Sequence, residues 1–129
     1  MMSLSLAKDE HQRLVMKLMD HFESMELIVT CACSGYVDCE KIRGFEPDVR
    51  AFDNNTGLNY VGEAKTCDNL KSEHTRKQFL AFSNRIMTKG KSAGKDVPFY
   101  IIVPDECKSE LDQILKELEL DKRGNIYVV

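Results

Sequence analysis

The chain is 129 residues long, with 43% hydrophobic residues, 30% charged residues and a formal net charge of −3. This length and composition predict a single globular domain over residues 1–129 and exclude two separate cores. No apolar run approaches the ~20 residues of a membrane helix, and the first residues lack the basic start and apolar stretch of a signal peptide. We therefore expect a cytoplasmic protein with no membrane partner.

Charge is distributed unevenly along the chain. Residues 1–63 contain 6 basic and 11 acidic side chains, whereas residues 65–95 contain 8 basic and 2 acidic ones. A basic segment inside an acidic chain is compatible with nucleic-acid binding. It is also typical of a lysine-rich helix face exposed to solvent, so charge alone does not decide between these two interpretations.

The first half of the chain shows the periodicities of one helix followed by three strands. Apolar residues recur every fourth position at Leu14, Leu18 and Phe22, as in an amphipathic helix. The segment Asp53–Gly57 is rich in Asn and Gly, which tolerate positive φ, and predicts a hairpin turn. The helix and the three strands are expected at residues 8–25, 27–33, 45–52 and 58–66.

The second half predicts a helix, a strand, a third helix and a short final strand. Leu70, Phe79, Phe82 and Ile86 are the expected inward residues of the first of these helices. The four elements are expected at 69–88, at 97–103, from 104 until Gly124 interrupts the helix, and at 125–129. A hairpin followed by a helical crossover implies an α/β (α+β) fold with a mixed sheet covered by helices.

Five cysteines occur at positions 31, 33, 39, 67 and 107. An odd number cannot pair fully within one chain, and without an export signal we expect free, buried thiols. A zinc site or thiol enzyme built on Cys31, Cys33 and Cys39 is a weaker alternative. No second CxxC motif, no suitable histidine and no base lies near these cysteines in the sequence.

Two carboxylates and a lysine are expected to converge at one end of the hairpin. Asp48 opens one strand, and Glu63 and Lys65 close its partner after 14 intervening residues. Strand alternation puts Glu63 and Lys65 on one face, and folding back at the turn brings Asp48 beside Glu63. Neighbouring carboxylates repel, and Mg²⁺ binds one or two carboxylates together with water and phosphate oxygens. An exposed Glu–Lys pair in an ordinary hairpin is the alternative, which the spacing alone favours.

The string Pro-Asp at 47–48, followed by Glu-Ala-Lys at 63–65, resembles the signature of the PD-(D/E)XK nucleases, the restriction-endonuclease-like superfamily. The order of the expected elements also resembles that superfamily's αβββαβ core over about residues 8–103, with an added C-terminal helix and strand. The resemblance implies a metal-dependent nuclease that hydrolyses phosphodiester bonds, in DNA above all.

The resemblance also implies a role for each residue of the motif. Asp48 and Glu63 are expected to hold Mg²⁺, for which Mn²⁺ can substitute, and Lys65 is expected to assist the attacking water. Many family members carry a metal-associated glutamate on the first helix, and Glu10 is the candidate here; a solvated acid in a first turn is the alternative. Gln78 is similar to the glutamine of the Gln-x-x-x-Tyr motif of recombination exonucleases and is expected to be catalytic, although the chain has phenylalanine in place of the tyrosine.

Basic side chains follow the expected catalytic strand and are candidates for binding phosphates that flank the cut. No helix-turn-helix and no aromatic platform is visible, so we expect recognition by DNA structure or through a partner rather than by base sequence. The acidic pI of about 5.6 fits a subunit of a larger nuclease assembly. A homodimer is the alternative, because cutting both strands with one small domain usually needs two copies. A nuclease-like subunit that only binds or assembles is the alternative; it predicts loss of a catalytic residue, and none is lost. The nucleic-acid-binding candidates are Lys71, His74, Arg76, Lys77, Arg85, Lys89, Lys91 and Lys95.

Overall fold

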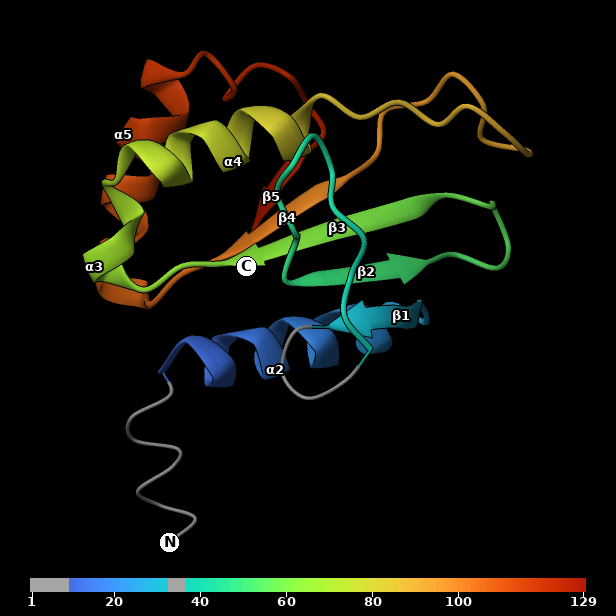
Figure 1. The fold of residues 1–129 in the computed structure, drawn as a ribbon, viewed down its shortest axis with the longest axis horizontal. Coiled ribbons are helices and arrows are strands. Elements are labelled where there is room, and N and C mark those ends of the chain that lie inside the picture. Colours follow the sequence, from blue (N-terminus) through green and yellow to red (C-terminus); the bar gives the residue numbers. More distant parts are fainter. Residues whose placement is uncertain (1–9, 33–36) are drawn as a thin grey trace, which may run out of the picture.

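The computed structural model describes residues 10–32 and 37–129. Its centre is one sheet in which the five strands lie in chain order (Figure 1). The second strand is antiparallel to the first and to the third, and the last two strands run parallel to the third. The predicted mixed sheet is therefore confirmed. The strands are β1 (Ile28–Ala32), β2 (Val49–Phe52), β3 (Asn59–Ala64), β4 (Phe99–Ile102) and β5 (Ile126–Val128).

Helices cover both faces of this sheet (Figure 1). Helix α2 (Glu10–Ser24) packs on one face, and α4 (Glu73–Ser83) and α5 (Lys108–Glu117) pack on the other. The described residues also form two short helical turns, α3 (Cys67–Leu70) and the 3₁₀ turn η1 (Asp105–Cys107). No helix within residues 10–32 and 37–129 is long and apolar enough to cross a bilayer.

Strand alternation divides the core between the two faces. Val61, Phe99 and Ile101 pack in the cluster beneath α4 and α5, whereas Ala64 and Tyr100 pack in the cluster beneath α2. Both clusters consist of side chains that are almost fully buried, because the central strands are covered on both sides. The order of helices and strands is the one that the sequence predicts, with α3 added.

The predicted helix over 69–88 is broken into two. Ser72 interrupts it, because its hydroxyl accepts a hydrogen bond from the Thr75 amide at 3.1 Å and caps the start of α4. The helix then ends at Ser83, and Ile86 forms an isolated bridge with Asp96. Ile86 is 55% exposed, so the prediction that it faces inward was wrong.

Two other element boundaries also differ from the prediction. The second strand begins at Val49 rather than near residue 45, because Ile42 and Phe45 already pair with each other in a tight turn. The third helix ends at Glu117 instead of continuing towards Gly124, since Glu119 has a positive φ of 59° that a helix cannot contain.

The cysteines are not the free thiols that the sequence predicts. Cys31 of β1 is bonded to Cys39, and Cys67 of α3 is bonded to Cys107 of η1. The fold brings their Cα atoms to 5.1 Å and 5.8 Å, within the range that a disulfide requires. Cys31 and Cys39 are therefore not available as zinc ligands, and Cys33 lies outside the described residues.

Candidate active site

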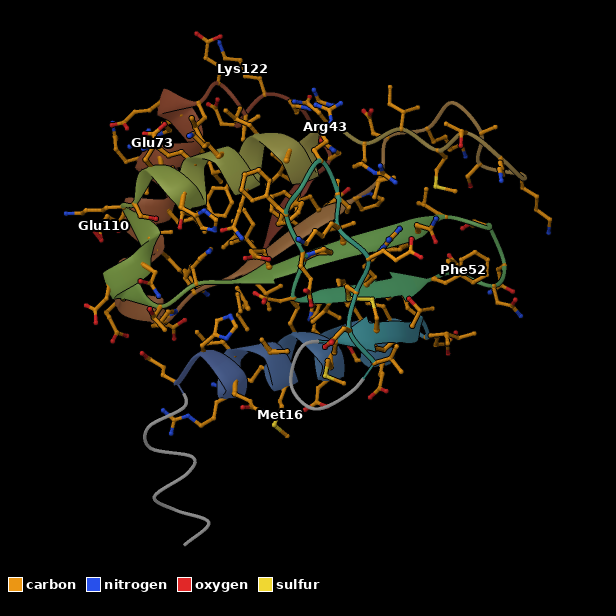
Figure 2. All side chains as sticks on the ribbon, viewed as in Figure 1. Met16, Arg43, Phe52, Glu73, Glu110 and Lys122 are labelled. Atoms are coloured by element: carbon orange, nitrogen blue, oxygen red, sulfur yellow. A yellow bond between two sulfur atoms is a disulfide. The ribbon has the colours of Figure 1, made fainter. Side chains whose placement is uncertain are left out.

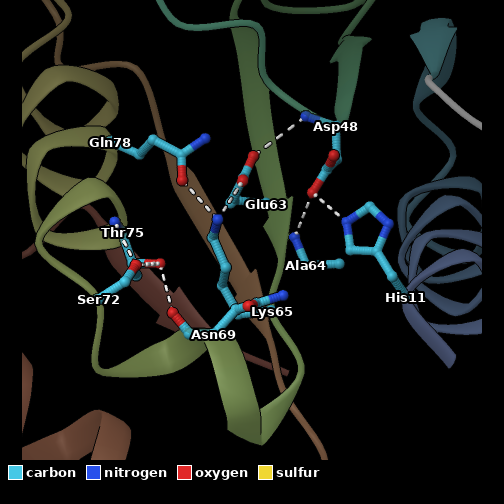
Figure 3. Close-up of polar contacts among 9 residues, drawn as sticks. All are labelled: His11, Asp48, Glu63, Ala64, Lys65, Asn69, Ser72, Thr75 and Gln78. Atoms are coloured by element: carbon cyan, nitrogen blue, oxygen red, sulfur yellow. Dashed lines mark hydrogen bonds and ion pairs between the residues drawn. The ribbon is translucent and has the colours of Figure 1, made fainter.

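The hairpin of β2 and β3 brings the two predicted carboxylates together. The strands pair in a register that joins Val49 to Gly62, which places Asp48 opposite Glu63. The Asp48 amide donates to Oε1 of Glu63 at 3.2 Å, and Oδ2 of Asp48 accepts from the Ala64 amide at 2.8 Å (Figure 3). Both side chains are buried at the end of the sheet where β3 finishes. The predicted meeting of Asp48 and Glu63 is therefore confirmed.

Lys65 completes the constellation on the α4 side of the sheet. Its Nζ lies 3.3 Å from Oε2 of Glu63 and donates to Oε1 of Gln78 at 2.5 Å (Figure 3). Gln78 comes from α4, so the helix and the strand meet at this lysine. The structure thus places Gln78 beside the three motif residues, as the sequence predicts. An ammonium group has three N–H donors, and Glu63 and Gln78 account for two of them.

Glu63 carries the electrostatic cost of this arrangement. Burial raises the pKa of Glu63 well above its usual value, and the neighbouring Asp48 carboxylate raises it further. The Lys65 ammonium and the hydrogen bond from the Asp48 amide act in the opposite direction. The net effect is that the pKa of Glu63 stays raised, so a cation bound beside this side chain would stabilise its charged form.

His11 of α2 is a member of the site that the sequence analysis missed. Its Nε2 lies 3.1 Å from Oδ2 of Asp48 (Figure 3). The hydrogen bond to Asp48 raises the pKa of His11 most, while burial lowers it. A signal was present in the sequence: His11 precedes Leu18 by seven residues, close to two helical turns, and therefore shares its buried face.

Glu10 occupies a different position from the one expected of a metal ligand. It is exposed and lines a cavity of about 590 Å³ together with Arg13, Lys17 and Lys108. The α2 side chain that contacts Asp48 is His11 instead. The metal role of Glu10 stays a prediction.

The cavity of about 590 Å³ is not lined by Asp48, Glu63 or Lys65. Its wall continues through the segment 102–106, which follows β4. We place the candidate chemistry at the carboxylate pair rather than in the larger cavity. The reason is that the pair combines buried acids, a lysine and an amide within hydrogen-bonding distance of one another.

The basic residues predicted to bind nucleic acid differ in their contacts and exposure. Lys71 forms an ion pair with Glu110 at 3.0 Å, and Arg76 forms one with Glu117 at 2.6 Å. His74 is exposed, with its ring against that of Phe45. Of the remaining candidates, Lys91 donates to the Asn55 carbonyl, Arg85 and Lys89 line a small cavity, and Lys77 and Lys95 are exposed. Their role in binding stays a prediction.

Metal ligands are few at the site. Within the described part of the chain, no group of three or more His, Cys, Asp or Glu side chains is arranged to hold a metal ion. A site for Mg²⁺ would therefore depend on Asp48 and Glu63, with water or substrate oxygens as the other ligands. This donor set fits Mg²⁺, which usually keeps several waters and binds only one or two carboxylates.

Comparison with known proteins adds no relative to this description. No protein-family model, no curated protein and no solved structure matches the chain.

Proposed function

We propose that the protein is a Mg²⁺-dependent nuclease of the PD-(D/E)XK type, which hydrolyses phosphodiester bonds in DNA. The observation that carries the proposal is the convergence of Asp48, Glu63 and Lys65 at one end of the sheet. Gln78 adds a fourth polar group at the same place. The order of helices and strands also agrees with the αβββαβ core that the motif implies.

The chemistry of the carboxylate pair supports a metal ion as cofactor. Asp48 and Glu63 would hold it, because their negative charges lie close together and Glu63 is only 2% exposed. When bound, Mg²⁺ supplies polarisation of the phosphodiester and lowers the pKa of a bound water. His11 holds Asp48 through Oδ2, as does the Ala64 amide, and so fixes the orientation of this carboxylate.

Lys65 has the geometry of a group that acts directly on the substrate. Its side chain is 12% exposed, and Glu63 and Gln78 fix the position of its ammonium group. The remaining N–H donor of Nζ has no partner among the described residues, and it would point to a phosphate oxygen or to the attacking water. There it would orient the water and stabilise the charge that develops on the phosphate.

Cleavage assays on supercoiled plasmid and branched DNA, in Mg²⁺ or Mn²⁺, test the proposal. Wild-type protein is expected to cut both substrates in the presence of metal and neither in EDTA. Asp48→Asn, Glu63→Gln and Lys65→Met each remove one motif group at nearly constant size, and each is expected to abolish cutting. Loss of a single positioned catalytic group typically costs about 10²–10⁴-fold in rate.

Lys122→Met is the matched control for the lysine variant. Lys122 is exposed in the turn between α5 and β5, remote from the motif (Figure 2). We expect it to cut like wild type. Residual cutting by Lys65→Met at the wild-type rate would show that the activity comes from another site or a contaminant. A folded wild-type protein that binds DNA but cuts no substrate would instead favour the binding or assembly subunit.

A further inference from the structure

A second, smaller cavity is lined by residues of β2 and β3, the strands that also carry the candidate active site, and is strongly basic. It has a volume of about 120 Å³, several times the roughly 10–15 Å³ that one water molecule needs. Arg50 of β2 lines it, together with Arg85 and Lys89 of the segment after α4. Asn59 and Thr88 add neutral polar groups. No acidic residue lines this cavity within the described part of the chain.

The two arginines are poorly neutralised by the protein. Neither Arg50 nor Arg85 forms an ion pair in the described residues, although both are half-buried. Burial lowers the pKa of Arg50 most, and the like charge of Arg85 lowers it further; Glu40 opposes this only in part. Two guanidinium groups beside one cavity, without a carboxylate between them, favour a bound anion.

The position of the cavity relates it to the carboxylate pair. Arg50 is paired with Val61 across the hairpin, two residues along the strands from the row that contains Asp48 and Glu63. Two residues along a strand correspond to about 7 Å. This short separation lets one nucleic-acid strand reach both the cavity and the carboxylate pair.

We propose that the cavity lined by Arg50 and Arg85 binds a backbone phosphate of the nucleic-acid strand, close to the bond that is cut. The guanidinium fork suits this ligand because it donates two parallel hydrogen bonds to phosphate oxygens. Lys89, an exposed residue of the cavity lining, adds a further positive charge. The identity of the ligand as a nucleic acid rests on the proposed function. The site would fix the strand relative to Asp48 and Glu63.

Phosphate titration followed by NMR tests the cavity without any need for cleavage. Inorganic phosphate is expected to shift the side-chain Nε–H signals of Arg50 and Arg85 in a saturable manner. Arg50→Gln should weaken this binding by about tenfold or more, since hydrogen bonds to charged groups are strong. Arg13→Gln is the matched control, because Arg13 lies on α2 and lines the other cavity. If phosphate leaves both signals unchanged, the proposal is overturned.

DNA binding in EDTA, measured by fluorescence anisotropy at several salt concentrations, tests the identity of the ligand. Arg50→Gln should weaken binding about tenfold and reduce the salt slope by about 1, as expected for one lost phosphate contact. Arg50→Lys keeps the charge but not the guanidinium fork, so its affinity for DNA should lie between those of wild type and Arg50→Gln. Arg85→Gln gives an independent second variant should Arg50→Gln not fold.

The two proposals fail in different ways. If the protein cuts DNA but neither Arg50→Gln nor Arg85→Gln changes binding, the phosphate site is wrong and the nuclease stands. If phosphate binds in the cavity but DNA does not bind, the assignment to a nucleic-acid strand is overturned. If DNA binds through Arg50 and no substrate is cut, the phosphate site stands and the nuclease is wrong.

Discussion

Gly62 lies in β3 beneath α2, where a methyl group would collide with the helix. A Cβ atom built on Gly62 would lie 2.6 Å from Cδ2 of Leu18 and 3.1 Å from Cε2 of Phe22. Both neighbours are fully buried, so neither can move into solvent. Gly62→Ala therefore tests whether α2 packs on β3 as closely as the structure shows. This packing matters for the site because α2 also brings His11 to Asp48.

The expected loss can be separated into two terms of opposite sign. Gly62 does not have a positive φ, so alanine can adopt its backbone conformation and would by itself stabilise the fold by about 0.4–1 kcal/mol. An extra methyl group in a packed core costs about 1–3 kcal/mol. The contact at 2.6 Å is far closer than two carbon atoms tolerate. We expect the second term to dominate, with a net destabilisation of roughly 1–2 kcal/mol.

Equilibrium urea unfolding, followed by circular dichroism, measures this difference. Leu18→Val provides the partner variant because it removes the Cδ2 atom that comes closest. On its own it should cost about 0.5–1.5 kcal/mol, as one buried methylene does. In the Leu18→Val background, Gly62→Ala should become neutral or stabilising. A Gly62→Ala protein as stable as wild type, with Leu18 intact, would refute the close packing of α2 on β3.

Three further predictions concern the residues that hold the site in place. Cys67→Ser opens a disulfide with a sequence separation of 40 and should lower the free energy of unfolding by about 4 kcal/mol on a loop-entropy estimate. Cys31→Ser opens one with a separation of 8 and should lower it by about 2.5 kcal/mol. Urea unfolding measures both losses of stability, and equal losses would contradict the prediction. The Asn55 amide lowers the pKa of Asp53, so the charged carboxylate stabilises the fold above its unfolded pKa. The difference in stability between wild type and Asp53→Asn should therefore disappear as the pH falls through the lowered pKa. Unfolding measured between pH 2 and 7 tests this, and a difference that does not change with pH would contradict it. For the proposed nuclease, His11→Ala should raise the Mg²⁺ concentration for half-maximal cleavage by about 10–100-fold, because His11 orients the metal ligand Asp48. A metal dependence equal to that of the wild type would show that His11 does not act at the site.

The motif could be predicted from sequence because it depends on local geometry. Strand alternation fixes Glu63 and Lys65 on one face, and a short hairpin leaves only a few registers in which Asp48 can meet Glu63. The same local rules gave the core residues of α2, where the period of 3.6 is unbroken from Leu14 to Phe22.

The remaining parts of the site depend on contacts between distant segments. Successive residues of α2 are rotated by about 100° around the helix axis. The prediction of Glu10, one residue away from His11, therefore selected a side chain that does not face Asp48. The cysteine pairs join segments up to 40 residues apart, and only the folded chain brings them together. Arg50 could not be predicted as a binding residue from the sequence, because only the folded chain places it beside the same cavity as Arg85.

The structure also changes which basic residues best account for binding to an acidic ligand. The sequence shows a basic stretch, but Lys71 and Arg76 pair with acids of α5, so that part of the stretch is largely neutralised. Arg50 and Arg85 are in the opposite situation, since their repulsion is already present in the folded protein and an anion relieves it. If the chain binds a polyanion as proposed, Arg50 and Arg85 are better placed to bind it than Lys71 and Arg76. Arg50 lies two residues along the strand from Asp48.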